Sequence, residues 1–546
     1  MTRRTNLRKG TLSTILITLG LLLAACAGDT PPPAADPPAA APAPAAAAAP
    51  APAAGADTDA PAATGGELVW IANFDTVSLD PIRSNDASTA DATAQMMEGL
   101  TTFRGTGELE PLLAESFSML PDGYTWEFNL RRGVQFHDGS TLNAEAVRRS
   151  ILRAIDPLEA SPSAFIVDMI TDVVAVDDYT VHIITEFPFS PLPSHLAHPV
   201  GFVISIAALD EEAAGGRPID ENPVGTGPFV LDNRVPGDHV SFVRFEGYWR
   251  GPANVERLRF ITIPDAPTRV AMLEAGEAHA ILAQPSDVYD IDRIPGLELE
   301  LIVGTGITYI GMNLQREPFD NILVRQAIAM AIDREAILYG IAEGQGVLAA
   351  GPLAPTVMHS ATDVPVLPFD PPAARALLEE AGFSDGDISF ELMNITGMAA
   401  RSRMIEFIQA NLADIGINVT LNHTDLGPFL EMTAHGEYDA VILGWTTVTG
   451  DADYGVYSLF HSSHFGDAGN RTFYYNPRID QLLDAGRRSS NPAERDAIYR
   501  EITEILIHDS PKVFLFHPYH PIATNGIGGL EVNFNARPNF FNAYIR

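Results

Sequence analysis

The order of hydrophobic and polar residues predicts a strand-rich first part of the chain. Four segments have strand patterns, at 67–73, 124–130, 179–184 and 240–245. The second of them alternates apolar and polar residues with a period of two, as a half-buried antiparallel strand does. We therefore expect the region from about 66 to 265 to consist mainly of strands joined by turns.

Further along, strands and helices alternate. Strands are predicted at 388–393, 417–421 and 438–443, with helices at 401–415 and 426–435 between them. The first of these helices places Met404, Ile405, Ile408 and Leu412 on one face. The pattern is βαβαβ, which favours a parallel sheet with right-handed crossovers. Two more helices, at 477–485 and 492–508, precede a last strand that starts at 513–516.

This topology predicts where a ligand binds. In open α/β sheets ligands lie beyond the carboxyl ends of the strands, so the loops at 394–397 and 444–451 share the ligand edge. The residues there that suit ligand binding are Asn394, Trp445, Thr446, Thr447, Thr449 and Asp451.

Each candidate also has a structural reading. Trp445 follows a buried strand and could pack in the core, but it stands where the cleft opens, and we favour cleft lining. The threonines are hydroxyl donors to a ligand or plain turn residues. Asp451 and Asp453 could take an ammonium group or cap the next helix; for Asp453 we favour the structural role.

The N-terminus has the features of an export signal. Arg3, Arg4, Arg8 and Lys9 precede an apolar run at 12–23, which is too short to span a bilayer comfortably. The run ends in Leu-Ala-Ala-Cys26, which resembles the lipobox of bacterial lipoproteins, so we expect 1–25 to be a signal peptide and Cys26 to carry lipid. The alternative is an ordinary signal cut after Ala27. An Ala/Pro-rich stretch, 26–65, follows and predicts a disordered tether.

Composition narrows the function classes. The formal net charge is −36, from 34 basic and 70 acidic residues, which makes nucleic-acid binding improbable. The only lysines are Lys9 and Lys512, and neither belongs to a phosphate-binding loop. The one cysteine allows no disulfide within the chain. No HExxH or GxSxG motif occurs, which leaves zinc-protease and serine-esterase functions without support, and we expect no cofactor.

Several segments, taken in order, resemble family 5 of the solute-binding proteins of ABC transporters, the peptide/opine/nickel group. They are LEPLLAES from 109, DGYTWEFNLRRGVQFHDG from 122, NPVGTGPF from 222, YWRG from 248 and PFDNILVRQAIAMAIDR from 318. The quoted segments lie between 109 and 334, and the resemblance as a whole extends over nearly all of 66–546.

The resemblance implies a binding protein without catalysis. Its expected fold is α/β, two-lobed and periplasmic-binding-protein-like, of the type II, large peptide-binding variety, with mixed sheets and βαβ units in the second lobe. The resemblance also implies lobe I at 66–307, with a strand-rich subdomain at about 105–222, lobe II at 308–512, and a return to lobe I at 513–546. We place the hinge crossings near 303–308 and 510–513.

The loop from Gly444 to Tyr454 is similar to that of the glutathione-binding subgroup. Dipeptide and oligopeptide binders place an aspartate three residues after the tryptophan, where this chain has Val448, and dipeptide binders have an arginine where this chain has Ile395. Simple dipeptide binding is therefore disfavoured. Candidate partners for a ligand carboxylate are Arg401, Arg403 and Arg471. Tyr309 after the first crossing, and Asp75 and Thr76 after the first strand, complete the candidate ligand-binding residues.

Histidine motifs elsewhere are read as structural. His137-Asp138-Gly139 lies between extended segments and predicts a turn. The pairs His195/His198 and His461/His464 have metal-compatible spacing, but the sequence places no third ligand, so we favour structural or exposed roles and expect no metal.

The resulting hypothesis is a monomeric, lipid-anchored binding component of an ABC importer. It would capture glutathione or another short peptide on the outer face of the cytoplasmic membrane and deliver it to permease and ATPase subunits. The alternatives are a binder of a nickel chelate or other small solute, a peptide-sensing receptor, or an extracytoplasmic hydrolase.

Overall fold

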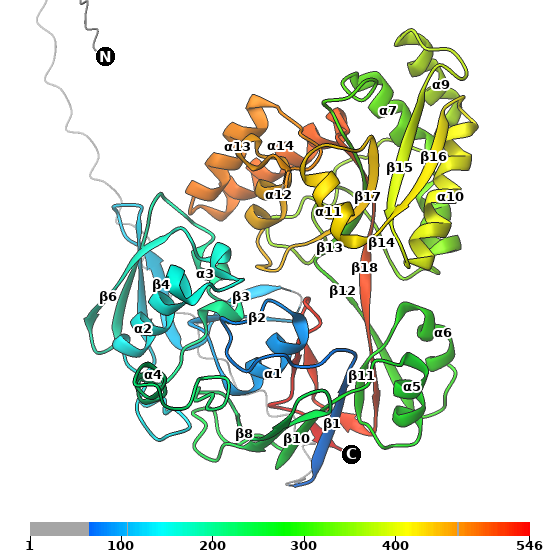
Figure 1. Cartoon of the computed structure of the whole chain (residues 1–546). Coiled ribbons are helices and arrows are strands. Elements are labelled where there is room, and N and C mark those ends of the chain that lie inside the picture. The colour runs from blue at the N-terminus through cyan, green and yellow to red at the C-terminus, as the bar shows by residue number, and fades with distance from the viewer. Residues whose placement is uncertain (1–64, 106, 467–468) are drawn as a thin grey trace, which may run out of the picture. The chain divides into compact units, whose positions relative to one another are not determined.

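A computed structural model describes residues 65–105, 107–466 and 469–546. The predicted signal peptide, Cys26 and most of the predicted tether lie outside these residues. Within them, no helix is long and apolar enough to cross a membrane. The described chain is built around one large mixed sheet and several small ones (Figure 1).

The large sheet has twelve strands. Ten follow one another in the order β16-β15-β17-β13-β18-β11-β1-β10-β9-β8, and β12 and β14 pair with β18 off this path. Their bounds are β1 Glu67–Ala72, β8 Phe229–Val235, β9 His239–Arg244, β10 Arg257–Thr262, β11 Ala280–Leu282, β12 Leu297–Val303, β13 Gly306–Met312, β14 Gly346–Leu348, β15 Ser389–Ile395, β16 Asn418–Thr424, β17 Ala440–Thr446 and β18 Lys512–Asn525.

A separate four-stranded sheet, in the order β4-β5-β7-β6, forms a subdomain. Its strands are β4 Ala114–Met119, β5 Thr125–Leu130, β6 Ile170–Asp177 and β7 Thr180–Thr185. Three two-stranded sheets complete the set: β2 Thr101–Arg104 with β3 Glu108–Pro111, β19 Ile527–Gly528 with β22 Tyr544–Ile545, and β20 Glu531–Val532 with β21 Pro538–Asn539.

Helices cover these sheets. They are α1 Ala87–Met96, α2 Ala144–Ile155, α3 Leu192–His195, α4 Ile206–Ala213, α5 Ala266–Glu274, α6 Val288–Ile291, α7 Ile322–Ala331, α8 Arg334–Ala336, α9 Pro371–Glu380, α10 Ala399–Ala413, α11 Leu426–Ala434, α12 Ala452–Phe460, α13 Pro477–Arg488 and α14 Pro492–Asp509. The five predicted elements from 388 to 443 are confirmed as β15, α10, β16, α11 and β17, with β15 parallel to both neighbours.

Strand β18 belongs to two groups of strands in succession. Residues 512–516 pair with β13, and residues 519–525 pair with β12, while β11 pairs with 522–524. We call 65–303 with 519–546 the first half and 306–516 the second half. The chain passes between the halves at Gly304–Thr305 and at His517–Pro518. The second crossing is later than the predicted 510–513, because Lys512 to Phe516 continue the second-half sheet.

Separate cores stabilise the two halves. In the second half, Leu392, Ile442 and Ile310 pack under α10, whose Met404 and Ile405 are buried as the sequence predicts. The opposite face of this sheet, with Tyr309 and Leu443, packs on α12 and α14. In the first half, one core lies around β1, β9 and β10 and another lies in the subdomain.

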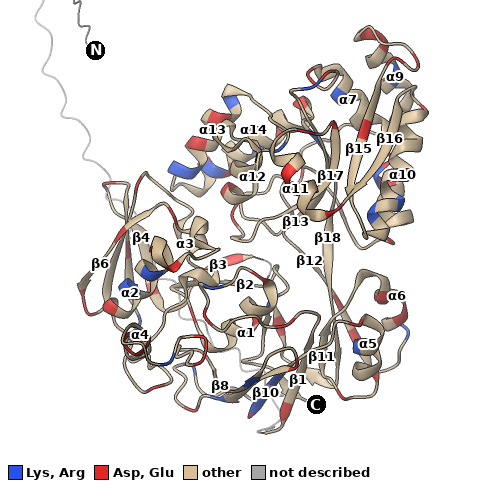
Figure 2. Cartoon of the chain, in the orientation of Figure 1, with Lys and Arg blue, Asp and Glu red and all other residues tan. Residues whose placement is uncertain are grey.

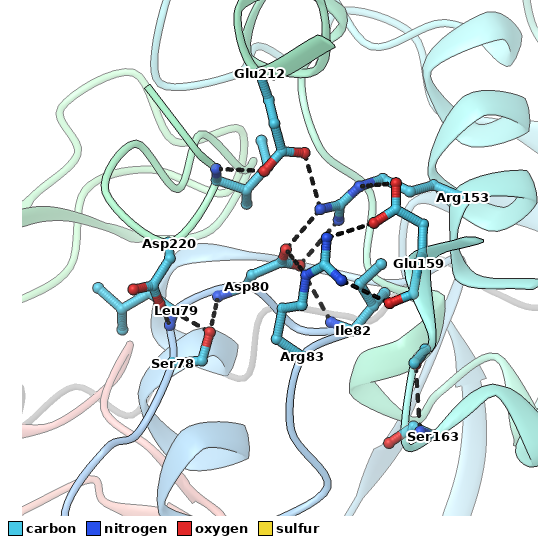
Figure 3. Close-up of polar contacts among 12 residues, drawn as sticks. Ser78, Leu79, Asp80, Ile82, Arg83, Arg153, Glu159, Ser163, Glu212 and Asp220 are labelled. Carbon is cyan, nitrogen blue, oxygen red and sulfur yellow. Dashed lines mark hydrogen bonds and ion pairs between the residues drawn. The ribbon is translucent and has the colours of Figure 1, made fainter. Parts of the chain in front are cut away.

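A buried ion pair ties the loop after β1 to the subdomain (Figure 3). Asp80 accepts hydrogen bonds from both terminal nitrogens of Arg153, at 3.0 and 2.6 Å, and Arg153 also contacts Glu212 at 2.9 Å. The Asp80 side chain is 2% exposed. Glu212 in turn accepts from the Ile219 amide at 3.1 Å, so α2, α4 and the loop after β1 share one network.

We expect Arg153→Met to lower the free energy of unfolding by about 3 kcal/mol, because it leaves the buried Asp80 carboxylate with only its longer ion pair to Arg83, at 3.5 Å. Arg149→Met, on the same helix, is the control: its pair with Asp210 is exposed, at 2.8 Å, and its loss costs at most about 1 kcal/mol. Urea unfolding measures both. Adding Asp80→Asn to Arg153→Met should recover part of the loss; equal losses in the two single arginine variants would contradict the assignment.

Candidate ligand site at the carboxyl edge of the sheet

The strand registers place the loops of both halves near the crossings. In the second half, Thr446 at the end of β17 pairs with Gly306, the first residue of β13 after the crossing. In the first half, β11 ends at Leu282, opposite Ile522, on the side of β18 nearest the crossing. Since β1 and β11 are parallel, the loop after β1 leaves the sheet at the same end. The carboxyl ends of β1, β15 and β17 therefore all point toward the crossings.

Trp445 is half-buried near the end of β17. Its indole stacks on the ring of Tyr454, with centroids 5.6 Å apart and planes at 26°. The indole Nε1 is buried and has no hydrogen-bond partner. A half-exposed aromatic pair with an unused donor is well suited to forming a ligand wall.

Asn394 lies near the end of β15 and is 0% exposed. Neither its amide nitrogen nor its amide oxygen has a hydrogen-bond partner. Buried polar atoms in native proteins almost always have partners, and an unpartnered one costs about 1–3 kcal/mol. A ligand or a buried water molecule could supply the missing partners.

Arg401 occupies the first turn of α10, one of the helices that carries basic residues in this acidic chain (Figure 2). Within the described residues its guanidinium has no hydrogen-bond or ion-pair partner, and burial lowers the pKa of Arg401. Its Nη2 would lie 3.4 Å from a Cβ at residue 444, so Gly444 leaves room for it against β17. The Met398 side chain does not cap the helix, so the N-terminal amides of α10 remain available. This arrangement suits an anion.

The other two candidate arginines are placed differently. Arg403 is exposed on α10. Arg471 donates to the Leu430 carbonyl at 2.7 Å and to the Thr433 hydroxyl, which holds its side chain against α11. Tyr309 is 3% exposed in the core beneath Trp445, and burial raises its pKa. The structure thus brings Arg401, Asn394 and Trp445 to one edge, with Tyr309 beneath them.

The threonines of the 444–451 loop divide between solvent and interior. Thr446 is exposed, while the Thr447 amide donates to the Thr305 carbonyl at 3.2 Å and helps fix the first crossing. Thr449 is 0% exposed, and its hydroxyl has no partner. Thr449 therefore resembles Asn394 in carrying an unused buried polar atom.

Asp451 is held in a buried ion pair. Its carboxylate accepts from two nitrogens of Arg495, at 2.8 and 2.6 Å, and from the Asp453 amide at 2.8 Å, where it caps α12. Arg495 keeps the pKa of Asp451 below its usual range despite burial. Asp453 pairs in the same way with Arg487. Both aspartates therefore brace the loop. No local pattern indicated their arginine partners, which are 44 and 34 residues away.

The loop after β1 is braced by the residues predicted to bind ligand. Asp75 accepts from the Gly237 amide at 2.9 Å, and the Thr76 carbonyl accepts from Arg234 at 2.8 Å. Phe74, which precedes Asp75, is 70% exposed, and Val77, which follows Thr76, is 62% exposed. These two apolar side chains at the cleft end of β1 were missed because single apolar residues in a turn carry no pattern.

The histidines have structural contacts. His137 lies in the predicted turn, where the Phe136 amide donates to the Ser140 carbonyl at 2.8 Å. His195 bonds the Ile166 carbonyl at 2.6 Å, and His461 stacks on Tyr457. Across the described ranges, no group of three or more His, Cys, Asp or Glu side chains could hold a metal ion.

A small polar pocket lies at the start of α1. It encloses about 10 Å³, enough for one water molecule. Its lining residues are Pro81, Ser84, Asn85, Asp86, Thr89, Ala90, Thr93, His198 and Pro199. A pocket of this size is too small for a peptide.

Comparison with known proteins identifies the fold. Residues 108–467 match the family described as bacterial extracellular solute-binding proteins, family 5. The chain is 33% identical to the glutathione-binding protein GsiB of Salmonella choleraesuis over 460 residues, covering 83% of this chain and 89% of that protein. It is 32% identical to GsiB of Escherichia coli K12 over 448 residues, covering 81% and 86%.

Two solved structures extend this similarity. HbpA2 from Haemophilus parasuis is 29% identical, with a TM-score of 0.82 over 88% of this chain and 100% of that one. The periplasmic binding protein DppA from Helicobacter pylori, in complex with the peptide STSA, is 27% identical, with a TM-score of 0.72 over 89% and 99%. The fold is therefore the two-lobed α/β fold of peptide-type periplasmic binding proteins, as the sequence predicted.

We expect Asn394→Leu to raise the free energy of unfolding of the ligand-free protein by about 1–2 kcal/mol, because leucine of similar size removes two unpartnered buried atoms. Asn313→Leu is the matched control. Asn313 is 1% exposed, and its amide nitrogen donates to the Gly436 and Tyr438 carbonyls at 2.9 and 3.0 Å. Its loss should destabilise the protein by about 1–3 kcal/mol. Chemical unfolding measures both, and destabilisation by both variants would contradict the reading of Asn394.

Proposed function

The chain belongs to family 5 of the bacterial extracellular solute-binding proteins, and from that premise we propose that it captures glutathione or another short peptide for an ABC importer. The homologues support the assignment of this chain as a periplasmic peptide- or solute-binding protein of an ABC importer. The family and the relatives named above are binding proteins. We further propose the identity of the ligand, the residues that bind it and the attachment of the protein to the membrane.

The observation that carries the proposal is Arg401, whose guanidinium has no partner among the described residues, together with the buried, unpartnered Asn394 at the same edge of the sheet. A ligand carboxylate would neutralise the guanidinium with two parallel hydrogen bonds and reach the free amides of α10. The Asn394 amide can donate to and accept from a peptide group. Glutathione carries two carboxylates and one ammonium, so its net negative charge suits a site whose aspartates, Asp451 and Asp453, are already neutralised by arginines.

Aromatic residues would enclose the rest of the ligand. Trp445 and Tyr454 supply one wall from the second half, and Phe74 and Val77 supply an apolar surface from the first. The GsiB relatives are named for glutathione binding, which favours this ligand over other short peptides. In this proposal Thr446 and Thr449 offer hydroxyl groups, and Arg403 and Arg471 stand further from the carboxylate.

The proposal includes attachment to the membrane and two moving lobes. Cys26, in its lipobox-like context, would carry the lipid, and the Ala/Pro-rich stretch would hold the binding body away from the bilayer. The lobes would close over the ligand about the crossings at Gly304–Thr305 and His517–Pro518, and the closed form would be presented to the permease. Lobe II would then end near the second crossing, at about 516.

Calorimetry tests the ligand. We expect reduced glutathione to bind, and Arg401→Met to weaken binding about 10–100-fold, because a charge-assisted hydrogen-bond pair is lost. Asn394→Leu should weaken it about tenfold while leaving the protein folded. Arg375→Met is the control, since Arg375 is exposed on α9 and pairs with Asp385 at 3.2 Å.

Di- to pentapeptides, oxidised glutathione and nickel chelates are titrated in parallel. Heat from a peptide but not from glutathione would keep the peptide class and change the ligand. Binding of a nickel chelate alone, or silence from every peptide, would overturn the proposal. An effect of Arg375→Met equal to that of Arg401→Met would overturn the assigned carboxylate site.

A further inference from the structure

The two halves touch at a second place, away from the crossings. The Ser190 amide, in the loop before α3 of the first half, donates to the Arg487 carbonyl at 2.7 Å. Arg487 is near the end of α13 in the second half, and Figure 1 shows α12 and α13 facing α3. The Ser190 hydroxyl also reaches the Gly486 carbonyl at 3.5 Å. The end of helix α13 is therefore docked on a loop of the other half.

The Arg487 side chain strengthens this contact. Its guanidinium lies 5.4 and 5.5 Å from the ring centroids of Phe187 and Phe189, both in the first half. An arginine cation at these distances from aromatic rings is attracted by the ring quadrupoles, and the attraction is stronger where water is excluded. Phe189 is 0% exposed, so one of the two rings is part of the subdomain core and does not move by itself.

The second half holds Arg487 ready for this contact. Asp453 accepts from two of its nitrogens, at 3.2 and 2.9 Å, and the Asp453 side chain is only 2% exposed. The ring of Tyr457 lies 3.3 Å from the guanidinium carbon. Both partners belong to α12, so the arginine fork keeps its position whether or not Phe187 and Phe189 are near.

The contact continues toward the candidate ligand site. Tyr454, next to Asp453, packs at 6.4 Å against Phe165 and at 6.4 Å against His195 of the first half. The same Tyr454 ring stacks on Trp445. The described contacts of Arg487 itself are with Asp453, Tyr457, Phe187 and Phe189, and none of these is a predicted ligand residue.

We propose that Arg487 is a closure latch, a positioning residue that stabilises the closed arrangement of the two halves without touching the ligand. This inference rests on the proposed closure of the lobes. A binding protein that closes must keep its closed form accessible without ligand, because the apparent affinity falls with the fraction of competent molecules. Loss of two cation–aromatic contacts would reduce that fraction about tenfold.

The test begins without ligand, on the full chain. Arg487→Met removes the cation and keeps the aliphatic stem. We expect the amide of Ser190 to exchange its hydrogen about tenfold faster, because its acceptor leaves whenever the halves separate. Small-angle scattering should show a larger radius of gyration. Arg488→Met is the matched control: its side chain is 56% exposed, and its described contact is with Asp484 of the same helix, at 3.7 Å.

A second variant distinguishes loss of the closure contact from loss of folding stability. Arg487→Met leaves Asp453 buried without its partner and could destabilise α12, so Asp453→Asn/Arg487→Met removes both charges. The latch predicts fast Ser190 exchange in both variants. If hydrogen exchange and scattering of both variants match those of the wild type and of Arg488→Met, the latch proposal is wrong. Fast exchange throughout the second half would also overturn the proposal, because it would indicate unfolding.

Reduced glutathione then serves as the probe for affinity. If the wild type binds glutathione, the double variant should bind it about tenfold more weakly. The affinity of Arg488→Met should equal that of the wild type. Unchanged affinity in the double variant would overturn the latch. If glutathione does not bind the wild type, the ligand in the proposed function fails, while the ligand-free exchange result still decides the latch.

Discussion

The continuity of strand β18 is the constraint on which the rest of the structure depends. One strand of fourteen residues pairs with β13 at its start and with β12 and β11 at its end, so the two halves share a backbone ladder. The crossing in this strand contains Pro518, whose backbone nitrogen carries no hydrogen to donate. At the other crossing, a Cβ on residue 304 would lie 2.5 Å from the His520 imidazole, so Gly304 permits the close approach. At the second crossing, β14 of the second half pairs with residues 516–518, so the second-half pairing reaches the crossing itself.

Neutralisation of buried charge separates the structural residues from the candidate functional ones. Asp80 with Arg153, Asp451 with Arg495 and Asp453 with Arg487 are paired at 2.6–2.9 Å in sites with little exposure. Each pair fixes a loop that leads to the crossings. Arg401 has no such partner, and its environment already disfavours its charge. Among the described residues, the buried cations Arg269 and Lys512 also have no carboxylate partner and bond only backbone carbonyls. Arg401 differs from them in lying at the carboxyl edge of the sheet.

Local patterns predicted the elements well, and long-range pairing explains what they missed. Met404, Ile405, Ile408 and Leu412 recur at helical spacing, so α10 and its buried face were predictable. The second crossing was not: residues 512–516 look the same in a strand of either half, and only pairing with β13 assigns them. Among the candidate site residues, periodicity and topology placed Asn394 and Trp445 near the ends of two strands, where the structure has them in β15 and β17. They could not show that Arg495 neutralises Asp451, or that Gly237 and Arg234 engage the loop at Asp75 and Thr76, because those contacts join distant segments.

Lys512 stands at the start of the shared strand, and it is the only lysine in the part of the chain that the structure describes. It is 2% exposed, with its ammonium nitrogen 4.3 Å from the ring centroid of Phe460 and 4.7 Å from that of Tyr309, and burial lowers its pKa. The folded body therefore presents its positive charge to solvent through arginine alone. Reagents that acylate lysine would find this amine only after the β13–β18 ladder opens, so the residue is a built-in reporter of unfolding at the one strand that both halves share.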